Sequence, residues 1–205
     1  GEDYIKLAYQ FAHEADPDAK LVLNDYNIEV PGKRDAFMKL VRDLQADGVP
    51  LHALGIQGHW QLGWPSYDNI RKTLELFSEF GLEIQITELD ISMYSWDDRS
   101  SKPGPTQDLL KYQADRYQRL FNIFKQFDSV KKVTTWGFAD DSTWLDDHPV
   151  KGRKDWPMMF DMKQRPKESF WRVVEEPVLS SLEADNGVWL KPFDCGVLTQ
   201  LLRID

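Results

Sequence analysis

EIQITELDIS, residues Glu83–Ser92, alternates apolar and polar side chains. This alternation predicts a half-buried β-strand. The strand carries Glu88 and then Asp90 toward its far end, and a period of two places both carboxylates on one side of it. A carboxylate at the mouth of a buried strand raises the question of what it binds or attacks, and the answer depends on the elements around it.

The sequence on both sides of this strand alternates between strands and helices. Four short apolar runs predict strands at Leu21–Asp25, within Leu51–His59, at Leu82–Ile91 and at Val130–Asp140. Apolar residues at helical spacing predict helices over residues 4–15, 34–48, 66–81, 106–127 and 165–176, the third with Ser66 as its N-cap. Such regular alternation is typical of βα units around a parallel sheet.

Polar residues follow each predicted strand. In chain order they are Asn24-Asp25, Gln57-Gly58-His59, Glu88-Leu89-Asp90 and Gly137–Asp140. α/β folds build their sites at this edge of the sheet. The steady series favours a (β/α)8 TIM barrel over an open sheet, because no Gly-rich phosphate loop follows any strand. A full barrel needs eight strands and about 250 residues, so we expect this chain to supply roughly four βα units, completed by further sequence, another chain or a second copy.

The composition describes a folded acidic chain. Its 205 residues are 41% hydrophobic and 13% aromatic, which suffices for one domain with a sizeable core. The net charge of -9 argues against nucleic acid and anionic membranes as partners. No apolar run is long enough to predict a transmembrane helix. Cys195 is the single cysteine, so no internal disulfide is expected.

Glu88 is either a polar strand end paired with a cation or a reacting group. His59, from the preceding strand, and Asp90 favour a reacting group, because an Asp that fixes a His, which in turn contacts a Glu, is a typical supporting arrangement. No catalytic metal is expected, since none of the four histidines has HExxH spacing. A metal-dependent hydrolase that uses His59, Asp90 and Asp140 stays as an alternative. No GxSxG turn is present for a serine nucleophile.

Many tryptophans fall at or after the predicted strand ends: Trp60, Trp64, Trp96, Trp136, Trp144 and Trp156. Aromatic residues of a core belong within helices and strands, whereas most of these belong to predicted loops. Flat aromatic surfaces beside polar groups suit sugar rings, whose C–H faces stack while their hydroxyls form hydrogen bonds. The residues therefore indicate a barrel mouth with a central carboxylate and a lining suited to carbohydrate.

Five motifs in order resemble glycoside hydrolase family 10, the endo-β-1,4-xylanases. They are LVLNDYN (Leu21–Asn27), LGIQGHW (Leu54–Trp60), ITELDIS (Ile86–Ser92), TTWGFADDSTWL (Thr134–Leu145) and MMFDMKQRPKESFW (Met158–Trp171). The similarity runs from about Glu2 to Val174. It implies a (β/α)8 barrel of which residues 1–176 are the C-terminal half, strands five to eight. Residues 177–205 would then be a tail or linker.

The resemblance also implies roles for the residues at the strand ends. Glu88 corresponds to the catalytic nucleophile, His59 contacts it, and Asp90 orients His59. The other counterparts bind substrate in the cleft: Gln57, Asn24, Tyr26, Trp136 and Trp144.

The family's retaining mechanism needs a second glutamate, the acid/base, in a Trp-Asp-x-x-Asn-Glu stretch that this chain lacks. The resemblance therefore implies the N-terminal half of the barrel, in cis or in trans, as a partner, with xylan or xylo-oligosaccharides as substrate. It implies no cofactor, and a secreted or periplasmic location although no signal is visible in the chain. The alternative is a non-catalytic truncated barrel that binds oligosaccharide in a Trp-lined cleft.

Overall fold

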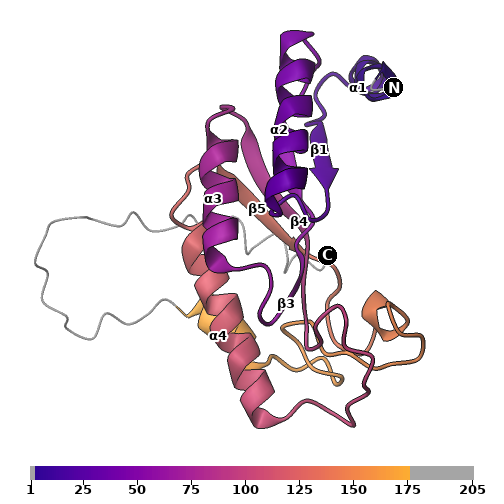
Figure 1. Ribbon diagram of the computed structural model, residues 1–205, viewed down its shortest axis with the longest axis vertical. Coiled ribbons are helices and arrows are strands. Elements are labelled where there is room, and N and C mark those ends of the chain that lie inside the picture. Colours follow the sequence, from indigo (N-terminus) through magenta and orange to yellow (C-terminus); the bar gives the residue numbers. More distant parts are fainter. Residues whose placement is uncertain (1–2, 176–205) are drawn as a thin grey trace, which may run out of the picture.

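The structure is a computed structural model that describes residues 3–175 (Figure 1). The predicted tail or linker, residues 177–205, lies outside the described residues. The strands are β1 (Val22–Asp25), β2 (Ala53–Ile56), β3 (His59–Gln61), β4 (Glu83–Ser92) and β5 (Val130–Thr135). The helices are α1 (Asp3–Ala15), α2 (Pro31–Ala46), α3 (Tyr67–Ser78), α4 (Gln107–Phe124) and α5 (Glu168–Val174), with a 3-10 turn η1 (Trp144–Asp146).

All strand pairings are parallel. β1 pairs with β2, β2 with β4, and β4 with β5, while the short β3 pairs with the far end of β4. Helices separate the main strands along the chain, and Figure 1 shows α2, α3 and α4 following one another along one side of the sheet. The predicted βα units and parallel sheet are therefore confirmed for the described residues.

The core lies between the sheet and these helices. Apolar faces of α2, α3 and α4 meet buried strand residues, and the Phe37 and Phe77 rings stack at a centroid distance of 5.4 Å where α2 meets α3. The predicted N-cap of α3 is confirmed, because the Ser66 hydroxyl accepts a hydrogen bond from the Asn69 amide. Thr106 caps α4 in the same way. No helix among residues 3–175 is long and apolar enough to cross a bilayer.

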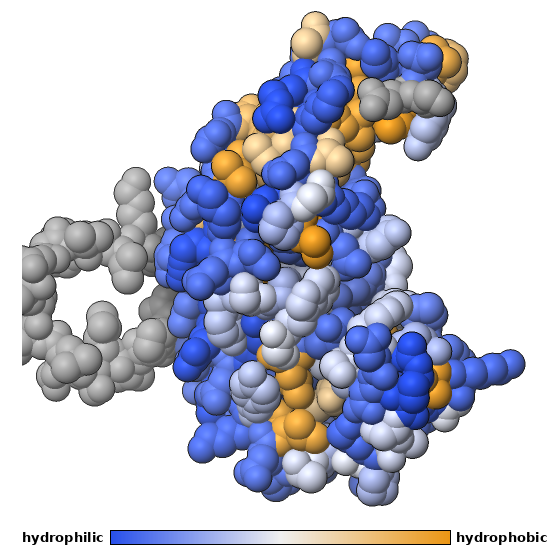
Figure 2. All heavy atoms as spheres, viewed as in Figure 1, coloured by the Kyte–Doolittle hydropathy of each residue, from blue (hydrophilic) through white to orange (hydrophobic). Residues whose placement is uncertain are grey.

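The apolar stripe of α1 stays exposed. Tyr4 and Phe11 keep 71% and 62% of their surface accessible, and the helix buries none of its residues within the described part of the chain. Figure 2 shows apolar residues gathered on the surface at this end of the molecule. An amphipathic helix with an uncovered stripe agrees with a sheet that ends at β1, the edge strand beside it.

The single strand predicted within Leu51–His59 is wrong in one respect: β2 ends at Ile56, and His59 begins a separate strand, β3. Gly58 causes the break: its φ of +83° lies in the left-handed region, where side chains other than glycine are strained. The predicted strand Val130–Asp140 is also too long. It ends at Thr135, before Gly137 with a φ of +144°.

The uniform alternation expected for EIQITELDIS also fails in its second half. Partly buried and fully buried residues alternate up to Ile86, but every residue from Leu89 to Ser92 is buried. The register against β5 shifts between Ile86 and Leu89, which is the mark of a β-bulge. The bulge falls on Thr87 and Glu88, and bulges often re-aim side chains beside functional sites.

Gly55 on β2 makes room for Asn24 on the neighbouring strand. A Cβ added at Gly55 would lie 2.7 Å from Asn24 Oδ1, closer than real contacts allow. The two residues are register partners, so the absent side chain permits the Asn24 amide to lie across the strand end.

We predict that Gly55→Ala destabilises the fold by about 1–3 kcal/mol, because the new methyl group overpacks against Asn24. Gly32→Ala is the matched control: nothing lies within 4 Å of the added Cβ, and alanine in a helix is expected to leave stability unchanged or raise it by up to about 1 kcal/mol. Urea denaturation of both variants measures the difference. Equal stability of the two would contradict the steric role of Gly55.

Candidate active site

Glu88 lies where three strands end together. Its Oε1 accepts a hydrogen bond from Asn24 Nδ2 at 2.9 Å, and its Oε2 lies 3.1 Å from His59 Nε2. The Glu88 backbone amide donates to the Gln57 carbonyl at 2.8 Å. The side chain stays 14% exposed. Both carboxylate oxygens are therefore held by donors from β1 and β3, while part of the group still reaches solvent.

The orientation of Asn24 is fixed by Thr87. The Thr87 hydroxyl donates to Asn24 Oδ1 at 2.7 Å, which leaves the amide NH2 group facing Glu88. Sequence reasoning placed Asn24 near the cleft but missed Thr87. The contact arises from the register that aligns β1, β2 and β4, so no motif in the linear sequence signals it.

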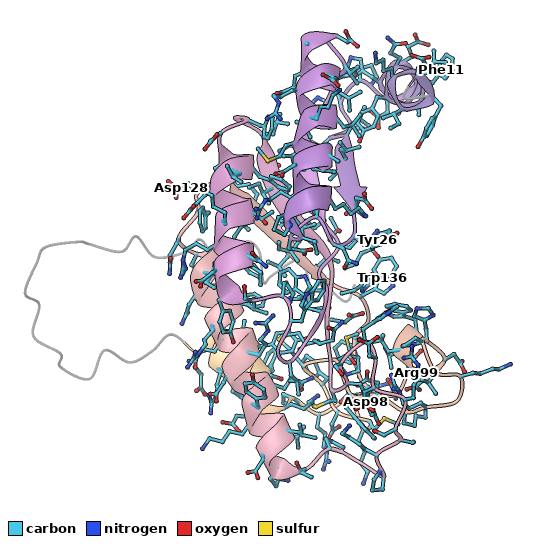
Figure 3. The ribbon with its side chains drawn as sticks, in the orientation of Figure 1. Phe11, Tyr26, Asp98, Arg99, Asp128 and Trp136 are labelled. Carbon is cyan, nitrogen blue, oxygen red and sulfur yellow. The ribbon has the colours of Figure 1, made fainter. Side chains whose placement is uncertain are left out.

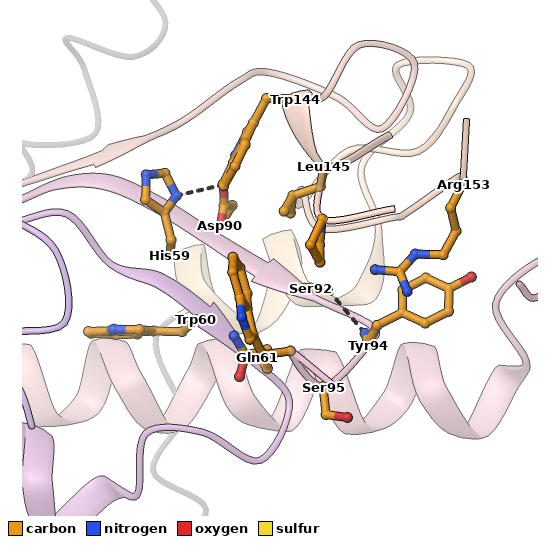
Figure 4. A pocket seen from close by; sticks show the side chains of 12 residues that line it. His59, Trp60, Gln61, Asp90, Ser92, Tyr94, Ser95, Trp144, Leu145 and Arg153 are labelled. Atoms are coloured by element: carbon orange, nitrogen blue, oxygen red, sulfur yellow. Dashed lines mark hydrogen bonds and ion pairs between the residues drawn. The ribbon is translucent and has the colours of Figure 1, made fainter. Parts of the chain in front are cut away.

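His59 bridges Glu88 to the buried Asp90. Its Nδ1 lies 3.0 Å from Asp90 Oδ2, and Asp90 is 1% exposed. Trp144 Nε1 donates to the same oxygen at 2.8 Å. Figure 4 shows Trp144, Asp90 and His59 converging from the η1 turn, β4 and β3. The structure thus brings the three predicted residues Glu88, His59 and Asp90 into one hydrogen-bonded series, and adds Trp144 to it.

The charges of this series act on His59. Burial by itself lowers the pKa of His59, but the hydrogen bonds and negative charges of Asp90 and Glu88 outweigh it, so the pKa is raised above its usual value. A protonated imidazole can donate one N–H to each carboxylate. The arrangement therefore favours an imidazolium between two carboxylates.

A cavity of about 740 Å³ opens beside Glu88's partners. Its lining includes most of the residues predicted to bind substrate, namely Tyr26, Gln57, Trp136 and Trp144, together with His59. Trp136 and Tyr26 are 48% and 55% exposed, and Figure 3 shows both at the same edge of the molecule. Lys33 Nζ lies 3.4 Å from the centre of the Tyr26 ring, a cation–π contact that helps to fix the ring.

Two of the tryptophans predicted to belong to loops are core residues instead. Trp60 on β3 is 1% exposed and Trp156 is 8% exposed. Trp60 Nε1 donates to Glu29 at 2.7 Å, and Glu29 is itself buried, which raises its pKa. No pattern in the sequence signals this pair, because Glu29 falls in a loop, where a carboxylate is usually solvated.

Asp140 belongs to a separate network. It binds Lys167 Nζ at 3.0 Å and the Met158 amide at 2.8 Å, and burial raises its pKa to about 6. This pairing ties the loop after β5 to the segment before α5. Among residues 3–175, no group of three or more His, Cys, Asp or Glu side chains is arranged to hold a metal ion.

Parallel βα units, with a glutamate whose partner His59 lines a cavity walled by aromatic residues, define part of an α/β barrel with a candidate carbohydrate site. The chain belongs to glycosyl hydrolase family 10, whose sequence profile matches residues 1–176.

Known relatives agree with this assignment. The endo-1,4-beta-xylanase of Geobacillus stearothermophilus is 48% identical over 176 residues, which cover 85% of this chain and 53% of that protein. The beta-1,4-xylanase of Dictyoglomus thermophilum is 46% identical over 177 residues, covering 85% and 50%. The chain spans about half the length of these curated relatives.

Solved structures show the same fold. A family 10 xylanase from Thermobacillus composti superimposes with a TM-score of 0.83 at 47% identity, covering 85% of this chain and 58% of that one. A further neighbour, 40% identical with a TM-score of 0.82 and covering 86% and 55%, is a mutant in complex with xylotriose. These neighbours confirm the predicted (β/α)8 fold class, of which the described residues form a fragment.

We predict that Asp90→Asn lowers the pKa of His59, because it removes the buried negative charge that stabilises the imidazolium. Stabilisation from this pair is fully present below about pH 6.5, the usual His value, and is lost as pH rises through the raised pKa of the folded state. NMR titration of the histidine ring protons measures the shift.

Asp161→Asn is the matched control for that titration. Asp161 is also ion-paired, with Arg165, but it lies outside the series that contains His59. The control should leave the His59 titration unchanged. An unchanged His59 pKa in Asp90→Asn as well would show that Asp90 does not govern the imidazole.

Proposed function

We propose that this chain is the C-terminal half of a retaining endo-1,4-β-xylanase barrel and that Glu88 is its nucleophile. The observation that carries the proposal is the setting of Glu88: its carboxylate is held by Asn24 and His59 beside a cavity lined by aromatic side chains. The relatives support the substrate class, since they are xylanases and one structural neighbour binds xylotriose.

The reaction follows from the geometry of two carboxylates in a retaining glycosidase. Glu88 attacks the anomeric carbon, an ester bond forms between its oxygen and that carbon, and the glycosidic C–O bond breaks as an acid protonates the leaving oxygen. Water, deprotonated by the same acid/base group, then attacks the anomeric carbon and releases Glu88. The two carboxyl groups stand about 5–5.5 Å apart in such enzymes.

The neighbours of Glu88 prepare it for this role. Asn24 and His59 each donate to one oxygen, which orients the carboxylate for attack. Asp90 positions His59 by accepting a hydrogen bond from its Nδ1–H. Asp90 acts through His59, and so we assign it a positioning role.

Substrate binding falls to the cleft lining. Trp136, Trp144 and Tyr26 offer ring faces to sugar C–H groups, and Gln57 and His59 offer hydrogen bonds to hydroxyls. Xylan is a polymer, which agrees with a secreted or periplasmic place of action.

The second glutamate comes from the other half of the barrel. Asp25 pairs with Lys33, Glu29 is buried against Trp60 and Asp140 pairs with Lys167, so each of these local carboxylates already has a partner. The N-terminal half, in cis or in trans, supplies the acid/base and the remaining sugar contacts. The chain by itself is therefore expected to be close to inactive on xylan.

We predict that adding the N-terminal half of the Geobacillus stearothermophilus relative restores xylan hydrolysis, and that Glu88→Gln then lowers kcat by at least about a thousandfold. Release of reducing sugar measures the rate. Glu83→Gln is the matched control. Glu83 is the first residue of the same strand but pairs with Lys20 on the surface, so this variant should retain activity within about twofold.

Two outcomes would contradict the proposal. Activity that survives Glu88→Gln would remove Glu88 from the nucleophile role. Assembly of the two halves with oligosaccharide binding but no turnover would favour the second candidate, a non-catalytic truncated barrel that binds oligosaccharide in its cleft.

A further inference from the structure

Glu29 is a buried carboxyl group that the proposed reaction does not use. It lies between β1 and α2 and is 1% exposed, and burial raises its pKa. Its Oε1 accepts the hydrogen bond of 2.7 Å from Trp60 Nε1. A buried indole N–H needs only a neutral acceptor, whereas burying a carboxyl group costs desolvation. The choice of a glutamate at this place therefore points to a role beyond filling the core.

The segment that carries Glu29 is firmly held. The preceding residue, Ile28, is fully buried, and the Val30 amide donates to the Asn27 carbonyl at 3.1 Å. Asn27 turns the chain with a φ of +55°. Because this tight turn follows directly on β1, the Glu29 carboxyl group has a fixed position relative to Asn24 on that strand.

The strand that carries Trp60 is held less firmly by its own backbone. β3 has three residues and pairs with β4 alone among the described residues. So short a strand, paired along one edge, gains little stability from its backbone hydrogen bonds. β1 lies on the other side of β2 from β4. The hydrogen bond from Trp60 to Glu29 therefore ties β3 to the segment after β1, a connection that strand pairing does not supply.

His59 shares β3 with Trp60. Neighbouring side chains of a strand project to opposite faces, and Figure 4 shows these two rings extending in different directions. Trp60 belongs to the core, with its ring centroid 6.2 Å from that of Phe124 on α4. His59 lines the cavity, and its Nε2 lies 3.1 Å from Glu88 Oε2. A displacement of the Trp60 indole is thus transmitted to His59 through the backbone they share.

We propose that Glu29 is a positioning residue for the hydrolysis and that it acts through Trp60. Its hydrogen bond fixes β3, and thereby the position of His59 relative to Glu88. Asn24, the second donor to Glu88, is held by the strand that leads into the same segment, so Glu29 keeps the two donors in register. This inference rests on the proposed nucleophile role of Glu88. Its catalytic weight follows from geometry, because a misplacement of about 1 Å can cost about a hundredfold in rate.

The test removes the hydrogen bond from each side in the full chain. Glu29→Met removes the acceptor and Trp60→Phe removes the donor. We expect both variants to lower the pKa of His59, because the imidazole moves away from Glu88 and Asp90, whose charges and hydrogen bonds raise that pKa. NMR titration of the histidine ring protons measures the change. The charge of Glu29 also acts on His59, and Trp60→Phe keeps that charge. This second variant therefore isolates the hydrogen bond, and it carries the test if Glu29→Met does not fold.

The same variants are assayed on xylan after assembly with the N-terminal half of the Geobacillus stearothermophilus relative. We expect Glu29→Met and Trp60→Phe each to lower kcat about ten- to hundredfold, with a change in KM of less than about threefold, because the reacting groups are misplaced while the cleft lining is kept. The double variant should fall no further than either single one, since both remove one hydrogen bond. Glu29→Gln keeps an acceptor for Trp60 and should restore most of the kcat that Glu29→Met loses.

Thr73→Val is the matched control. Thr73 is fully buried and accepts a hydrogen bond from Arg34 Nη1 at 3.2 Å, so the variant also removes a buried polar contact. That contact joins α3 to α2, and neither residue lines the cavity. The control should leave both the His59 titration and kcat unchanged.

The outcomes separate this inference from the proposed function. A lowered His59 pKa and kcat in both Glu29→Met and Trp60→Phe, with recovery in Glu29→Gln, support it. A His59 titration and kcat like those of Thr73→Val overturn it and leave the nucleophile assignment intact. A lowered pKa with unchanged kcat also overturns it, because the position of His59 then has no effect on the reaction. Activity that survives Glu88→Gln overturns the proposed function, and with it the reaction that Glu29 would serve.

Discussion

The hydrogen bonds to the two oxygens of Glu88 are the contacts on which the rest of the site depends. One donor comes from β1 and the other from β3, so Asn24 and His59 meet Glu88 only if the parallel register is correct. Two glycines make that register compatible with the side chains. Gly55 leaves space for the Asn24 amide, and Gly58 ends β2 so that His59 can begin a new pairing with β4.

Burial of charge is the second constraint. Asp90 is almost completely removed from water, and a carboxylate in that position is costly unless donors surround it. His59 and Trp144 are those donors. Trp144 thereby has two roles: its N–H stabilises the buried Asp90 carboxylate, and its ring forms part of the cleft wall. A ligand packed on that ring would touch a residue that is hydrogen-bonded to Asp90, the partner of His59.

Much of this could be predicted from the sequence, because its signals are local. Helical periodicity and the Ser66 cap located the helices, apolar runs located the strands, and polar strand ends placed Glu88, His59 and Asp90 together. The misses come from effects that no local pattern carries. A single positive φ at Gly58 divides a strand, a bulge at Glu88 ends the alternation, and burial of Trp60 depends on packing between elements distant in sequence. The contact of Thr87 with Asn24 follows from three-strand register alone.

The claim that Glu88 is the nucleophile of a retaining glycosidase is tested most directly by trapping its covalent intermediate. A 2-fluoro xylobioside with a dinitrophenyl leaving group forms the glycosyl-enzyme without help from an acid, because that leaving group needs no proton, and the fluorine slows its breakdown. The reagent would be added to the chain assembled with its complementary half, and the peptides analysed by mass spectrometry. The account predicts a covalent 2-fluoroxylobiosyl adduct on the peptide that carries Glu88, attached to the Glu88 side chain. An adduct on another carboxylate such as Asp90, or none although the assembled protein hydrolyses xylan, would contradict it.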